Sequence, residues 1–81
     1  MNNKRNTMTH FFSNLESVNN HLIDNGFCSL EDYTQQHLLE DKAVRDGHGK
    51  MLTGNSLRHM AFIQPVEKDG VRMFTVKIDR H

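Results

Sequence analysis

The 81-residue sequence has no tryptophan, one proline and one cysteine, and its ten basic and ten acidic residues leave no net charge. The single cysteine, Cys28, excludes an internal disulfide framework and is typical of a protein from a reducing compartment. No apolar run reaches the length of a membrane span or of a signal-peptide core. We therefore expect a cytoplasmic protein that does not associate with membranes.

The motifs that would indicate an enzyme or a metal protein are also missing. Six histidines are present, but none stands at the spacing from cysteine or from another histidine that zinc sites require. The glycine-rich segment 46–50 lacks the spacing and the ending of a phosphate-binding loop. Cys28 is interpreted as a buried or half-buried thiol, and His37 as a hydrogen-bonded core histidine. We expect no enzymatic activity, no cofactor and no bound metal.

The C-terminal third predicts a β-hairpin with strands at Leu57–Gln64 and Val71–Asp79, because apolar and polar residues alternate on both sides of an Asp-Gly pair. We expect a three-residue loop, Lys68-Asp69-Gly70, since this register gathers the bulky side chains on one face. That face would hold Met60, Phe62, Phe74, Val76 and Ile78. The opposite face would hold Ala61, Ile63, Met73, Thr75, Lys77 and Asp79.

Two helices are expected ahead of the hairpin. The first begins near Met8, carries the apolar stripe Phe11, Leu15, Val18 and Leu22, and ends at Asn25-Gly26, with Phe27 folding back on its last turn. Residues 1–7 are polar and without periodicity, and we expect a disordered arm there, followed by a single domain over residues 8–81.

The second helix is expected from about Leu30 to about Arg45. Its clearest stripe is Leu30, Tyr33, His37 and Val44, whereas Leu39 and Ala43 point nearly the opposite way. Either this helix is covered on two sides or its second half is irregular. The loop Asp46–Asn55 contains Met51 and Leu52, which either enter the core or start a short strand.

These elements predict an α+β fold in which two N-terminal helices pack on a C-terminal antiparallel hairpin, in the order α-α-β-β. The edge of Val71–Asp79 would remain open, which favours a homodimer formed through this hairpin edge. For function we expect a small non-enzymatic regulator or inhibitor that binds another protein, of the size common among phage, plasmid and bacterial accessory proteins. The residues that this fold would leave for a partner are Leu39, Ala43, Ile63, Met73, Thr75 and Lys77.

The alternative is a regulatory protein that binds nucleic acid. Its basic residues would be Lys4 and Arg5 in the arm and Arg58, Arg72, Lys77 and Arg80 in the hairpin. The absence of net charge and the acidic segment 16–46, with seven acids against two bases, argue against strong phosphate binding.

Overall fold

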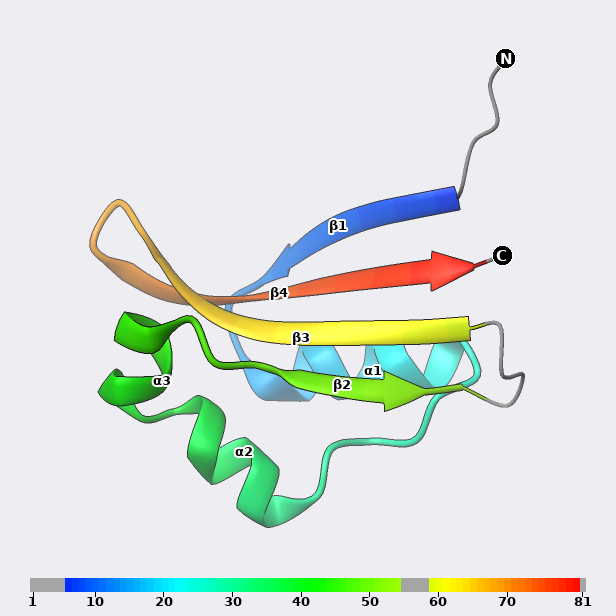
Figure 1. Ribbon diagram of the computed structural model, residues 1–81, viewed down its shortest axis with the longest axis horizontal. Helices are drawn as coiled ribbons and strands as arrows, with labels where there is room; N and C mark the ends of the chain where they lie inside the picture. The colour runs from blue at the N-terminus through cyan, green and yellow to red at the C-terminus, as the bar shows by residue number, and fades with distance from the viewer. Residues whose placement is uncertain (1–5, 55–58, 81) are drawn as a thin grey trace.

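In the computed structural model, which describes residues 6–54 and 59–80, a four-stranded antiparallel sheet is joined by three helices (Figure 1). The α+β class is confirmed, but the order α-α-β-β is only partly correct because a strand precedes the first helix and another follows the last. The elements are β1 (Asn6–Phe12), α1 (Leu15–Asp24), α2 (Asp32–Leu38), α3 (Asp41–Asp46), β2 (Lys50–Thr53), β3 (His59–Lys68) and β4 (Val71–Arg80).

The sheet is built around the predicted hairpin, and its strand order is β1-β4-β3-β2. β1 returns beside β4, with Phe12 opposite Phe74. β2, the short strand that contains Met51 and Leu52, lies beside β3. The edge of Val71–Asp79 that we expected to be open is therefore occupied by β1. The edges of the sheet among the described residues are β1 and β2.

The helix predicted from Met8 begins seven residues later, so the expectation of helix for Met8–Phe12 is wrong. His10 and Phe12 face α1 while Thr9 and Phe11 face away, which is the alternation of a strand. The side chain of Asn14 then caps α1 by accepting a hydrogen bond from the Ser17 backbone N–H at 2.8 Å. Of the arm expected at 1–7, residues 6 and 7 belong to β1, and 1–5 lie outside the described residues.

The rest of α1 agrees with the prediction. Leu15, Val18 and Leu22 are its buried residues, and the helix ends at Asn25. Gly26 follows with a φ of 86°, a left-handed conformation that glycine adopts without a steric penalty. The Phe27 backbone N–H returns to the Leu22 carbonyl at 2.9 Å, and the Phe27 side chain is buried. The predicted return of Phe27 onto the last turn is confirmed.

The single helix expected from Leu30 to Arg45 is interrupted between Leu38 and Asp41. Glu40 has an extended backbone, with a ψ of 140°, and it begins α3 as the N-cap residue. Residues 38 and 43 would lie about 140° apart on one continuous helix. The interruption turns the chain so that Leu38 and Ala43 are both fully buried. The second of our two alternatives, irregularity in the second half, is the correct one.

The hairpin has a two-residue loop, so the predicted three-residue loop is wrong. Lys68 pairs with Val71, and the two loop residues both have positive φ, 53° at Asp69 and 79° at Gly70. This is the type I′ conformation, whose twist matches that of the flanking strands. The one-residue shift exchanges the two faces of β3, so that Ile63 points into the core and Phe62 points away from it.

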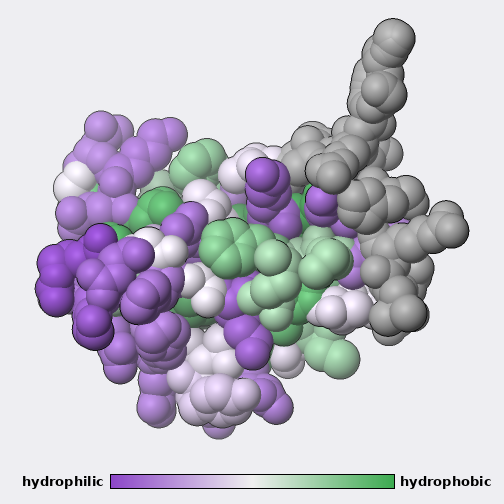
Figure 2. All heavy atoms as spheres, in the orientation of Figure 1, coloured by the Kyte–Doolittle hydropathy of each residue, from purple (hydrophilic) through white to green (hydrophobic). Residues whose placement is uncertain are grey.

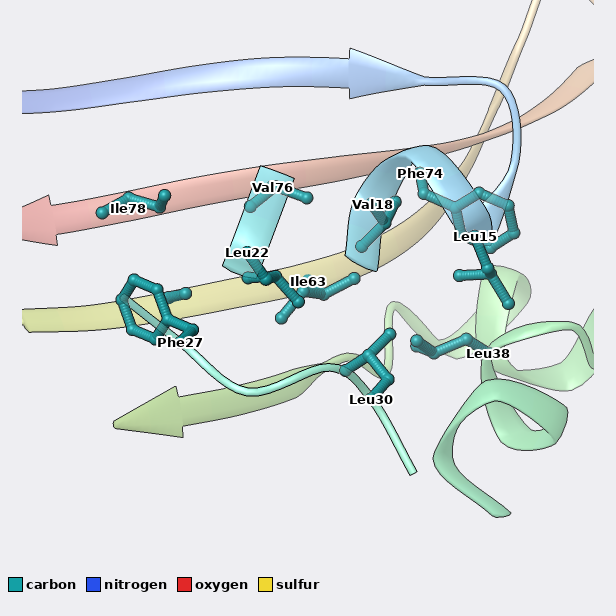
Figure 3. Close-up of a cluster of buried hydrophobic side chains, with 11 residues drawn as sticks. Leu15, Val18, Leu22, Phe27, Leu30, Leu38, Ile63, Phe74, Val76 and Ile78 are labelled. Atoms are coloured by element: carbon teal, nitrogen blue, oxygen red, sulfur yellow. The ribbon is translucent and has the colours of Figure 1, made fainter. Parts of the chain in front are cut away.

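The core lies between α1 and one face of the sheet (Figure 3). Ile63 from β3 and Val76 from β4 lie opposite each other in the sheet, and both are fully buried. Phe27 and Leu30 close the core from the segment between α1 and α2. The buried cluster is Leu15, Val18, Leu22, Phe27, Leu30, Leu38, Ala61, Ile63, Phe74, Val76 and Ile78.

Candidate protein-binding face

The sheet face opposite α1 carries no second layer among residues 6–54 and 59–80, because the helices lie on the other side or beside β2 and β3 (Figure 1). We call it the outer face. By strand register it consists of Thr9 and Phe11 of β1, Met51 and Thr53 of β2, Met60, Phe62, Gln64 and Val66 of β3, and Met73, Thr75, Lys77 and Asp79 of β4. Figure 2 shows hydrophobic side chains gathered in the middle of this view, with hydrophilic ones around them.

A groove of about 240 Å³ crosses the outer face from β2 to β4. Its lining residues come from three adjacent strands, since Met51 lies opposite Phe62, and Phe62 lies opposite Lys77. Met60 and Asp79 form the neighbouring pair. The groove is therefore walled by two methionines and a phenylalanine, with one base and one acid at its side.

Gly49 lies against the Phe62 ring. A Cβ atom built on Gly49 would lie 2.6 Å from the Phe62 Cζ atom and 2.5 Å from the Ile63 carbonyl oxygen. Only a residue without a side chain allows the segment leading into β2 to pass this close to β3. The Phe62 ring, which forms the aromatic side of the groove, therefore contacts the backbone of Gly49.

Polar residues make up half of the outer face and lie beside the apolar ones. Lys77 and Asp79 are two residues apart on β4 and so share this face. The Thr75 hydroxyl donates a hydrogen bond to the Gln64 carbonyl at 3.3 Å, which satisfies a polar group at the centre of the sheet. Near the hairpin turn, the Lys68 ammonium lies 4.7 Å from the centre of the Phe11 ring.

The structure brings together three of the residues predicted for partner binding: Met73, Thr75 and Lys77 on the outer face. Ile63 and Ala43 are fully buried, so neither lies on a surface. Leu39 is 53% exposed, but it lies at the α2–α3 junction rather than on the sheet. The sequence reasoning did not include Met51, Met60 and Phe62 among the partner-binding residues. The Asp-Gly pair was the signal that could have identified Met60 and Phe62, because a two-residue loop there places both on the outer face.

Within the described part of the chain, the basic residues of the nucleic-acid alternative do not lie together on one surface. Arg72 donates a hydrogen bond to the Leu39 carbonyl at 2.9 Å and forms an ion pair with Asp41, so it ties β4 to the junction of α2 and α3. Lys77 lies on the outer face. Lys4, Arg5 and Arg58 lie outside the described residues, as does the side chain of Arg80.

The described histidines and acids form no group of three that could hold a metal ion. His37, which we expected in the core, is partly exposed. Its Nδ1 atom lies 3.4 Å from Glu40 Oε1, and its ring stacks on that of His48. Cys28 is exposed rather than buried. A hydrogen bond to Glu31, and the negative charge of that residue, raise the pKa of Tyr33.

None of the helices in the described part of the chain is both long enough and apolar enough to cross a membrane.

No protein-family model, no curated protein and no solved structure matches the chain. The function has to be inferred from the geometry of the outer face.

Proposed function

We propose that this protein acts by binding another protein through its outer face, as a non-enzymatic regulator or inhibitor. The observation that carries the proposal is the apolar groove on a sheet face that no other element of residues 6–54 and 59–80 covers. Contiguous apolar surface bordered by polar groups is characteristic of protein interaction sites. The side chains that would contact the partner first are Met51, Met60 and Phe62, with Lys77 and Asp79 at the polar rim.

The residue types of the groove indicate what kind of surface it fits. Methionine side chains are flexible and polarisable, so Met51 and Met60 can adapt to apolar groups of different shapes. Phe62, held against Gly49, supplies a rigid aromatic contact of the kind that dominates binding energy at interfaces. The rim of the groove has one positive group, Lys77, and one negative group, Asp79. We therefore expect the partner to carry no strong charge of either sign. The expected partner segment carries one or two large apolar side chains among polar ones.

The test is selection from a displayed library of peptides that tile the proteome of the source organism. Phe62→Asp places a charge in the groove, whereas Ile23→Asp places the same charge at an exposed apolar position on α1. Peptides selected on the wild-type protein should bind Ile23→Asp equally well and Phe62→Asp at least about tenfold more weakly, a loss of about 1.4 kcal/mol or more. Equal binding to Phe62→Asp would exclude the groove as the binding site.

The same protein is tested for nucleic-acid binding by the mobility of duplex and single-stranded oligonucleotides. We expect no shift at micromolar protein, because the chain carries no net charge and Arg72 is engaged with Leu39 and Asp41. A shift that weakens steeply with added salt would favour the nucleic-acid alternative over protein binding.

A further inference from the structure

The outer edge of β1 pairs with no other strand among the described residues, and it is a second feature of the sheet, distinct from the groove. β1 pairs with β4 on one side, and it is the terminal strand of the sheet order on the other. Its seven residues, NTMTHFF, include no lysine, arginine, aspartate, glutamate, proline or glycine. Natural proteins usually protect an edge strand with charges, proline, a bulge or very short length. β1 has none of these protections among its described residues.

The opposite edge of the sheet is different. β2 has only four residues and begins with Lys50. A strand of this length offers few backbone groups to a partner strand, and a charged residue at its start is one of the features that protect an edge from pairing. The two edges of one sheet thus differ in the properties that control strand pairing, and only β1 is suited to it.

We propose that the β1 edge pairs with β1 of a second copy of this chain, antiparallel and across a twofold axis, to form one continuous sheet of eight strands. A second copy is the favoured occupant because an uncharged strand places no like charges opposite itself. The chain has no net charge, so two copies do not repel each other at a distance. This edge differs from the hairpin edge expected from sequence, which β1 itself fills.

The register follows from the symmetry. With Thr9 at the twofold axis, Thr9 lies opposite its own copy and Thr7 lies opposite Phe11. Directly opposed threonines are a favourable cross-strand pair. Residues opposite each other share a sheet face, so the outer faces of both copies lie on the same side of the joined sheet. The dimer does not depend on the proposed partner, but it would present two grooves on the same face, separated by the two β1 strands.

The experiment measures the mass of the protein by sedimentation velocity and light scattering across the micromolar range. Thr9→Lys and Thr9→Asp each place like charges opposite one another at the axis, whereas an equal mixture of the two variants places opposite charges there. The matched control is Thr53→Lys, because Thr53 is also an exposed threonine on the outer face of an edge strand, β2. Circular dichroism confirms that each variant is folded.

We expect the wild-type protein and Thr53→Lys to dimerise alike, each Thr9 variant to be a monomer over the same range, and the mixture to recover the dimer. A wild-type monomer up to high micromolar concentration would overturn the proposal and leave the edge to a strand of a foreign protein. Unchanged dimers of the Thr9 variants, loss of the dimer in Thr53→Lys, or a mixture that stays monomeric would overturn the pairing at Thr9.

Discussion

Ile63→Ala will lower the free energy of unfolding by about 2–5 kcal/mol, because it removes a fully buried side chain from the centre of the core. Phe62→Ala, one position earlier on the same strand, will cost about 1 kcal/mol or less, since its ring lies on the outer face and is partly exposed. Urea denaturation followed by circular dichroism measures both values.

The two variants form a matched pair, because both replace a large apolar residue by alanine at adjacent positions of β3. A change in strand propensity therefore affects both to a similar extent. A larger loss of unfolding free energy for Phe62→Ala than for Ile63→Ala would support the three-residue loop. It would also mean that the two faces of β3 are assigned the wrong way round.

Leu38→Ala will also destabilise the protein by about 2–5 kcal/mol, whereas Leu39→Ala will change its stability by about 0.5 kcal/mol or less. Leu38 is fully buried at the end of α2, and Leu39 is half-exposed where the chain turns toward α3. The Leu39 backbone carbonyl, which accepts the hydrogen bond from Arg72, is kept in both variants. Thermal and urea unfolding measure the difference. Equal losses of unfolding free energy for Leu38→Ala and Leu39→Ala would show that the interruption between α2 and α3 is misplaced.

The elements that follow from local signals were predicted correctly from the sequence. The end of α1 at Asn25, the return of Phe27 and the location of the hairpin turn at Asp69-Gly70 each depend on a few neighbouring residues with distinct backbone preferences. The buried residues Leu15, Val18 and Leu22 were recognised from their helical spacing for the same reason.

The errors arose where tertiary contacts choose between two local possibilities. Phe11 stands four residues before Leu15, so the helical stripe extends into β1 by coincidence. What makes Met8–Phe12 a strand is the edge of β4, which lies more than sixty residues away in the chain. The interruption after Leu38 likewise goes with tertiary structure that no local pattern reveals, namely the burial of Leu38 and Ala43 and the contact of Arg72 with Leu39 and Asp41.

The candidate site was only partly predictable because it depends on one register. Met73, Thr75 and Lys77 were assigned to one face of β4 by simple alternation, and that assignment stands. The choice between a two-residue and a three-residue loop then decided which residues of β3 lie on the same sheet face as these three. Favouring the register that collects large side chains placed Phe62 in the core, whereas the left-handed backbone at Asp69 and Gly70 places it on the outer face.

The central claim is that Ile63 lies beneath α1 while Phe62 lies on a face that no other described element covers, and it is tested most directly by thiol reactivity. Phe62→Cys and Ile63→Cys are each made in a Cys28→Ser background, so that the introduced thiol is the only one in the protein. The rate of reaction with a disulfide reagent is measured under native conditions. We predict rapid reaction of Phe62→Cys, near the rate in denaturant, and strong protection of Ile63→Cys. Protection of Phe62→Cys together with rapid reaction of Ile63→Cys would contradict the account.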